Sequence, residues 1–266
     1  MTDPGKKDLI GVHVDVIGYD DAVARIVRAA QQRMTLGVSA LAVHGLMEGA
    51  FDPEHRYRLN ALHLVVPDGT GILWGLNLLH KTGLADRVRG PGLMLRTCAA
   101  AAEHGLPIFL FGSTRSILEK LCESLLRRFP GLHIAGIEPS RFRQISTEED
   151  RRLVDRIASS GAALLFVGLG CPRQEVWVFE HLDSLQMPML AVGAAFAMHA
   201  GVTGEAPVWM QQHALEWLYR LWREPRLWRR NLLAFPYLAL IGLQKFGVSP
   251  LRAAGPISPA KWLGYG

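Results

Sequence analysis

Asp68 is the acidic side chain best placed for chemistry, because it stands between Pro67 and Gly69 directly after an apolar run. The run, residues 62–66, predicts a buried strand. Ligands of α/β proteins bind where such strands end. A carboxylate at that point can act as a general base that takes a proton from a hydroxyl group. The alternative is a turn aspartate that only caps the next helix.

A second candidate is the glycine-rich stretch 168–175, which reads GLGCPRQE and follows the apolar residues 162–167. Gly168 and Gly170 allow a tight turn and a close approach of the backbone to a ligand. The stretch is typical of a nucleotide or phosphate site. Its spacing is neither that of a P-loop nor that of a dinucleotide fingerprint.

The residues that follow these glycines predict the start of a helix. Pro172 suits the first turn of a helix, whose free amide groups can face an anion. Gln174 and Glu175 would then lie in the first turn, near whatever binds there. For Glu175 alone the plain alternative is the general preference for acids at helix N-termini.

Three further loops carry candidate anion-binding groups. Arg87 and Arg89 stand in a basic loop before a helical segment and can meet a phosphate, although a solvated loop is the alternative. Gly112 and Gly193 each follow an apolar run and precede a helical pattern, as in other anion sites at helix N-termini.

The order of the segments predicts the fold that positions these residues. Short apolar runs alternate with amphipathic helical patterns, and a glycine follows most of the apolar runs. This rhythm predicts an α/β fold with a Rossmann-like, mostly parallel sheet and helices on both faces. The expected strands are 10–16, 38–43, 62–66, 107–111, 132–135, 162–167 and 189–192. In such a sheet one edge would hold Asp68, Gly112, Gly168 and Gly193.

Two helix starts have recognisable caps. Asp52 before Pro53 predicts an N-cap and a first helical residue, within a helix expected from about 44 to 60, rather than part of a metal site. Ser146 with Glu149 three residues later fits a capping box at the start of a helix over 146–160.

The composition describes a folded chain. Its 266 residues are 49% hydrophobic and 20% charged, which excludes a disordered protein. The three cysteines are widely spaced, which argues against a disulfide framework and for a reducing compartment. The N-terminus carries no long apolar core, so no secretory signal is expected.

The positive charge is concentrated near the C-terminus. From residue 206 onward the chain has eight basic and two acidic residues, a charge of +6, whereas the whole chain carries +5. We therefore expect a core domain over 1–204 and a basic, aromatic appendage over 205–266. Residues 231–243 are apolar but too short to span a bilayer, and they favour an interfacial helix on a membrane. A basic helix packed on the domain and, more weakly, nucleic-acid binding are the alternatives.

Six blocks of the chain, in this order, resemble the WecG/TagA/CpsF glycosyltransferases over roughly residues 10–245. The most specific are Gly-x-Gly-x-Pro-x-Gln-Glu at 168–175 and Glu-Trp-x-x-Arg at 216–220. The remaining blocks are 67–69, 87–91, 196–201 and 206–209. The resemblance implies a Rossmann-like fold with a C-terminal appendage that touches membrane and completes the active site.

The resemblance also implies an activity. It is the inverting transfer of a sugar from a UDP-sugar to a polyprenyl-diphosphate-linked saccharide, at the cytoplasmic face of the inner membrane, in exopolysaccharide or cell-surface polysaccharide synthesis. The expected catalytic residues are Asp68, as the general base, and Gln174, which corresponds to the family's glutamine. No cofactor, metal or nucleic acid is expected, and a homo-oligomer is one option. The expected substrate-binding residues are His44, Gly69, Arg87, Arg89, Gly112, Gly168, Gly170, Pro172, Glu175, Gly193, Arg220 and Arg223.

This sequence departs from the family pattern at four places. Ala40-Leu41-Ala42 replaces a usual Thr-x-Asn, with Ser39 and His44 as nearby polar candidates. The other departures are Gly92 in place of an acid, Ala197 in place of aspartate and Glu205 in place of arginine. These departures affect the expected donor sugar and acceptor more than the expected reaction class. The sequence is compatible with ManNAc, ManNAcA, glucose or glucuronic acid as the donor sugar.

The expected mechanism has two requirements. Asp68 would take the proton of the acceptor hydroxyl, and the leaving diphosphate must be stabilised. Many transferases stabilise it with a metal ion that an Asp-x-Asp pair holds after a strand. No such pair stands at a strand end here, so the diphosphate is expected to contact Arg220, Arg223, Arg226 and backbone amides. A weakened, membrane-bound UDP-sugar-binding subunit and a nicotinamide enzyme are the rival readings. The absent Gly-x-Gly-x-x-Gly argues against the second.

Overall fold

The computed structural model describes residues 5–204, 207, 210, 228, 232–248 and 259. The predicted contacts of Arg220, Arg223 and Arg226 lie outside these residues, as does the departure at Glu205.

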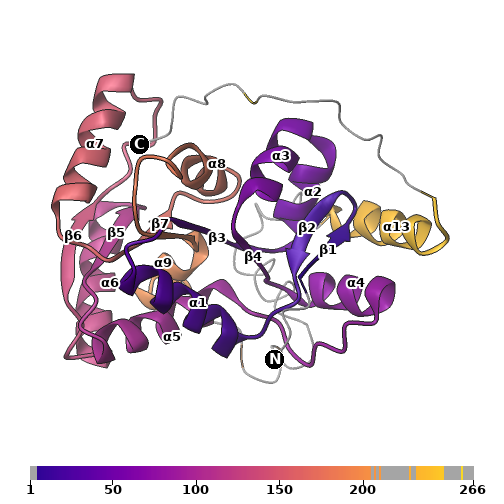
Figure 1. Cartoon of the computed structure of the whole chain (residues 1–266), viewed down its shortest axis with the longest axis horizontal. Coiled ribbons are helices and arrows are strands. Elements are labelled where there is room, and N and C mark those ends of the chain that lie inside the picture. Colours follow the sequence, from indigo (N-terminus) through magenta and orange to yellow (C-terminus); the bar gives the residue numbers. More distant parts are fainter. Residues whose placement is uncertain are drawn as a thin grey trace.

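A six-stranded sheet forms the centre of the molecule (Figure 1). Its strand order is β4-β3-β8-β7-β5-β6, and every neighbouring pair is parallel. This confirms the predicted Rossmann-like α/β fold. The strands are β3 (Leu36–Leu41), β4 (Leu64–Pro67), β5 (Ile108–Gly112), β6 (Ile134–Glu138), β7 (Leu164–Gly168) and β8 (Pro188–Ala191).

Helices cover both faces of this sheet, as predicted. One layer packs against the side chains of Leu64, Val66 and Phe166, and the other packs against those of Val65, Leu165 and Val167, because side chains alternate along a strand. The first layer contains α1 (Tyr19–Gln31), α5 (Gly90–Glu103), α6 (Arg115–Arg128) and α9 (Gly193–His199). The second contains α2 (Val43–Phe51), α3 (Pro53–Ala61), α4 (Thr70–His80), α7 (Thr147–Ser159), α8 (Arg173–Glu180) and α13 (Ala234–Lys245).

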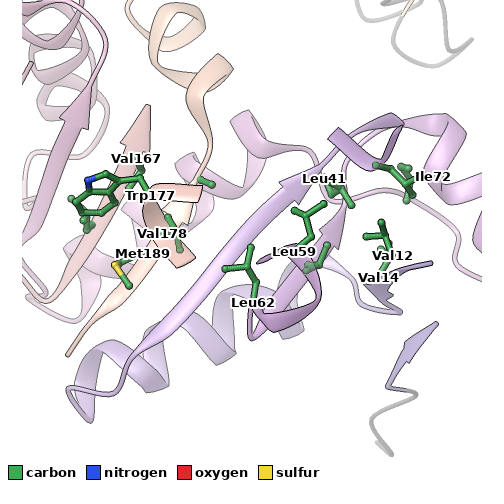
Figure 2. Packing of buried hydrophobic residues seen from close by; sticks show 14 of the residues in the cluster. Val12, Val14, Leu41, Leu59, Leu62, Ile72, Val167, Trp177, Val178 and Met189 are labelled. Atoms are coloured by element: carbon green, nitrogen blue, oxygen red, sulfur yellow. The ribbon is translucent and has the colours of Figure 1, made fainter. Parts of the chain in front are cut away.

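The second layer has a continuous apolar core, part of which Figure 2 shows. Around α8, Trp177 and Val178 lie beside Val167 and Met189 of the sheet. Trp177 also packs against Phe111, with 5.0 Å between the ring centroids. The same core continues to Leu41 and Ile72 near the other end of the sheet.

The N-terminal residues form a hairpin rather than the predicted single strand over 10–16. Strands β1 (Lys6–Leu9) and β2 (Val12–Asp15) pair antiparallel in a sheet of their own. The chain turns at Ile10 and Gly11, both with positive φ, so the alternating pattern is interrupted at its start. Asp15 Oδ2 then accepts a hydrogen bond of 2.7 Å from Val65 N, which attaches the hairpin to β4.

The predicted helix caps are confirmed. Asp52 Oδ1 accepts a hydrogen bond from Glu54 N at 2.9 Å, and Pro53 opens α3. The expected helix over 44–60 is therefore two helices, α2 and α3. Ser146 and Glu149 form the capping box of α7.

Helix α13 belongs to the predicted appendage, yet it packs on the body of the protein. The Tyr237 hydroxyl donates a hydrogen bond of 2.7 Å to Gly71 O of α4. Gln244 bonds both Ile10 N and the Asp8 carboxylate of the hairpin. None of the described helices is long and apolar enough to cross a membrane. The domain boundary after residue 204 stays a prediction.

Candidate active site

The carboxyl edge of the sheet gathers most of the predicted site residues. Asp68 follows β4, His44 follows β3, Gly193 follows β8 and Gly170 follows β7. These four strands are consecutive in the sheet. The loops that leave them therefore meet at one place, which is where α/β sheets bind ligands.

Gly112 lies farther along the same edge. Three strands separate β5 from β4, so Gly112 is about 19 Å from the Asp68 strand at ordinary strand spacing. A Cβ atom at Gly112 would lie 2.6 Å from the Gly168 carbonyl, and φ is +113°. Gly112 thus allows close main-chain packing of β5 on β7.

Asp68 is held beside the N-terminus of α5. Its Oδ2 accepts a hydrogen bond of 3.3 Å from Gly90 N, the first residue of that helix, and its own amide donates to Leu41 O. Asp68 as a whole residue is partly exposed, as a group that takes a proton from a substrate must be. Gly69 follows with φ +115° and ψ +144°, a conformation that only glycine adopts readily.

Two arginines flank the Asp68 loop. Arg87 is buried, and its guanidinium donates a 2.7 Å hydrogen bond to Thr70 Oγ1 at the start of α4. Arg89 is half-buried and is the N-cap residue of α5. The carbonyl of Pro67 accepts a hydrogen bond from Val88 N, which ties this loop to the end of β4. Both arginines thus lie in a loop that is hydrogen-bonded to the Asp68 loop.

Gln174 holds two loops together. Its Oε1 accepts hydrogen bonds from Gly170 N at 3.2 Å and from Gly193 N at 2.9 Å, and its Nε2 donates to Glu175 Oε1 at 2.9 Å. Ser39 Oγ donates a longer bond of 3.4 Å to the same carboxyl oxygen. We call these five residues the glutamine latch.

The latch corrects one prediction from the sequence. Gly193 was expected at an anion site and Gly170 in close backbone contact with a ligand, but the amide groups of both donate to Gln174. Gly193 is required there, because a Cβ atom at this position would lie 2.4 Å from Gln174 Oε1. Helix α8 begins at Arg173, with Pro172 as its N-cap, one residue later than predicted.

Glu175 lies inside the protein, with 1% of its surface exposed. Burial raises the pKa of its carboxyl group, and hydrogen bonds from Gln174 and Ser39 oppose the shift. Among the described residues, Oε2 has no hydrogen-bond partner, which fits a neutral carboxyl group better than a charged one. Its buried position favours a structural role, in which it holds Gln174 and Ser39 through hydrogen bonds, rather than contact with a ligand.

His44 joins the first loop to the glycine-rich stretch. Its Nδ1 lies 3.8 Å from Cys171 Sγ, and its Nε2 lies 3.5 Å from Glu48 Oε1. Ser39, the other polar candidate near the departures at Ala40 and Ala42, is fully buried and bonded within the latch. No group of three His, Cys, Asp or Glu side chains in the described part of the chain is arranged to hold a metal ion.

Sequence reasoning missed Tyr19. Its hydroxyl accepts a hydrogen bond of 2.9 Å from Arg89 N, next to the amide that contacts Asp68. No local pattern signals this contact, because Tyr19 begins a helix far from Asp68 in sequence.

Together the loops at the carboxyl edge present a partly exposed acid, with two arginines in the neighbouring loop, at the edge of a parallel sheet. Such a site can remove a proton beside an anionic ligand.

Comparison with known proteins agrees with this arrangement. Residues 7–249 match the family model described as the glycosyl transferase WecG/TagA/CpsF family. A protein of Bacillus spizizenii named N-acetylglucosaminyldiphosphoundecaprenol N-acetyl-beta-D-mannosaminyltransferase is 29% identical to the chain over 196 residues. The similarity covers 73% of this chain and 74% of that protein. The chain is thus a glycosyltransferase and belongs to the WecG/TagA/CpsF family.

Proposed function

We propose that this enzyme transfers a sugar from a UDP-sugar, with inversion, to a saccharide carried on polyprenyl diphosphate. The observation that carries the proposal is Asp68, a partly exposed carboxylate held by Gly90 N at the carboxyl edge of the sheet. The name of the Bacillus relative, which couples a mannosaminyl transfer to a diphosphoundecaprenol acceptor, supports the same substrate class.

In the proposed reaction, Asp68 accepts the proton of the acceptor hydroxyl group as that oxygen attacks the anomeric carbon of the donor. The bond from the sugar to UDP breaks, and UDP leaves with the bonding electrons. Arg87 and Arg89 lie beside the loop and favour anionic groups there. Arg220 and Arg223, outside the described residues, are proposed to approach the diphosphate from the appendage.

Membrane attachment is part of the proposal. The helices α4 and α13 pack together and carry exposed apolar side chains, namely Trp74, Phe235 at 70% exposure and Leu238, with Phe246 at 86% directly after α13. We treat these side chains as one apolar surface. Because α4 begins at Thr70, directly after the Asp68 loop, this surface lies close to the site. It supports peripheral binding to the cytoplasmic face of the membrane, where the acceptor lipid is embedded.

Liposome sedimentation tests the membrane step. Trp74→Ser with Phe246→Ser should reduce the fraction that sediments with anionic liposomes at least severalfold, because both exposed rings are lost. Phe142→Ser is a matched control, since Phe142 is an exposed aromatic on another part of the surface. Equal sedimentation of all three proteins would remove this surface from the proposal.

Release of UDP tests the reaction. A panel of UDP-sugars is assayed with a lipid-diphosphate saccharide acceptor for the wild type, Asp68→Asn and the control Asp183→Asn, an exposed acid away from the site. We expect acceptor-dependent release that Asp68→Asn lowers roughly 10²–10⁴-fold, because the base is lost. Release by Asp68→Asn at the wild-type rate would refute the base.

A UDP-sugar-binding subunit with weakened catalysis is the second candidate. It is favoured by two alanines that replace polar family residues beside the Asp68 loop. A Cβ atom at Gly90 would lie 3.3 Å from Ala40 Cβ, and one at Gly69 would lie 4.0 Å from Ala42 Cβ. This candidate predicts UDP binding without turnover for every donor in the same panel.

A further inference from the structure

Tyr19 contacts the backbone that leads to Asp68. It is the first residue of α1, and its hydroxyl accepts a hydrogen bond of 2.9 Å from Arg89 N. Tyr19 Oη also lies 3.5 Å from the Arg89 carbonyl oxygen, which accepts a hydrogen bond of 2.8 Å from Leu93 N within α5. A side chain from α1 thus contacts both polar backbone groups of the residue that caps α5.

The next amide along the chain holds the acid. Gly90 N donates to Asp68 Oδ2 at 3.3 Å. The carbonyl of Arg89 and the amide of Gly90 belong to one planar peptide unit, so they rotate together. Any contact that fixes the Arg89 carbonyl therefore also fixes the direction in which Gly90 N–H points toward Asp68.

The ring of Tyr19 is itself held in place. The Arg96 guanidinium lies over its face, 4.5 Å from the centroid, and pairs with Asp20. On the side of α5, Gly92 leaves the space that the hydroxyl occupies, since a Cβ atom there would lie 2.4 Å from Tyr19 Oη. Burial raises the pKa of Tyr19, with the Asp68 charge a lesser cause, so the hydroxyl keeps its proton at neutral pH.

We propose that Tyr19 is a positioning residue for glycosyl transfer, which orients Asp68 through the Arg89–Gly90 peptide. This inference rests on the proposed role of Asp68 as the base. A displacement of about 1 Å at a reacting group can reduce the rate about 10²-fold. The hydroxyl of Tyr19 therefore contributes to turnover without touching the substrate.

Two substitutions test the contact from its two sides. Tyr19→Phe removes the hydroxyl and keeps the ring under Arg96. Gly92→Ala places a methyl group where the hydroxyl lies. Tyr57→Phe and Gly18→Ala are the matched controls, because Tyr57 is exposed and a Cβ atom at Gly18 meets nothing within 4 Å.

The assay reports kcat per UDP-binding molecule, KM for the donor and the melting temperature. We expect Tyr19→Phe and Gly92→Ala each to lower kcat roughly 10- to 100-fold, with a donor KM within about twofold of wild type. In the Tyr19→Phe background, Gly92→Ala should have a smaller effect, because the closest atom is then Cζ at 3.0 Å. The controls should behave as wild type.

Several outcomes would overturn the inference. A wild-type kcat per UDP-binding molecule in Tyr19→Phe would do so, as would a change confined to KM or full additivity of the two substitutions. Asp68→Asn, measured beside them, separates the two proposals. If Asp68→Asn is inactive while Tyr19→Phe turns over normally, only the role of Tyr19 is wrong. If Asp68→Asn is active, the proposed base is wrong.

Discussion

The Asp68 loop and the glutamine latch lie at the same edge of the sheet but use their polar groups differently. In the latch, Gln174 and Glu175 point inward, and Gln174 bonds main-chain amides of two loops. In the other loop, Asp68 is partly exposed and receives its Gly90 contact from one side. The residue types are alike, yet only the second arrangement leaves a carboxylic residue partly exposed.

The cost of burying polar groups explains the difference. A buried amide or carboxyl group must find hydrogen bonds inside the protein, so it becomes part of the scaffold. The latch therefore stabilises the turn at Gly170 and the start of α9 at Gly193. A partly exposed acid keeps its contact with solvent and can exchange it for a substrate hydroxyl group.

Of the substitutions that test this comparison, Gln174→Ala is expected to have the largest effect on stability. It leaves the amides of Gly170 and Gly193 without their acceptor, and it should lower the free energy of unfolding by roughly 2–4 kcal/mol. Urea denaturation measures this change, with Gln144→Ala as an exposed control. Asp68→Asn should stay within about 0.5 kcal/mol of wild type. If Gln174→Ala abolishes turnover at unchanged stability, Gln174 acts on the substrate and the comparison fails.

A buried polar group without partners should make stability depend on pH. His55 is buried, neither ring nitrogen has a hydrogen-bond partner among the described residues, and burial lowers its pKa from 6.5 to about 4. The unfolded chain binds the proton first as the pH falls. Stability should therefore be full above pH 6.5 and should decline by up to about 3 kcal/mol as the pH falls to about 4.

Urea denaturation at a series of pH values tests His55. His55→Leu should remove this part of the slope, whereas His104→Leu, at an exposed site, should leave it unchanged. An unaltered slope in His55→Leu would show that another group accounts for the acid sensitivity.

The smallest effect is expected from Ser39→Ala. The Ser39 hydroxyl makes one long hydrogen bond of 3.4 Å to Glu175, so its loss should cost about 0.5–1 kcal/mol. Turnover should stay near that of the wild type, because Ser39 is fully buried. A tenfold loss of kcat at wild-type stability would instead give Ser39 the role of the threonine hydroxyl that is absent at Ala40.

Sequence reasoning predicted the sheet and the residues that stand at its carboxyl edge well, because both depend on local patterns. Apolar runs that end in glycine mark buried parallel strands, and Asp52 and Ser146 mark helix starts through their own side chains. The hairpin over residues 6–15 was missed, because the alternation along β2 continues the pattern of a single strand. The turn at Ile10 and Gly11 shows only in the backbone.

Within the candidate site, the sequence by itself determined which residues stand at the strand ends, because chemistry, spacing and the family blocks are all local properties. Only the tertiary structure decided that Gln174 turns inward to bond Gly193, and that Tyr19 reaches the peptide beside Asp68. The physical reason is that a helical pattern in the sequence shows only which side chains share a face of the helix, not which groups they contact. The loops that supply their hydrogen-bond partners come from distant parts of the chain, and folding alone brings them together.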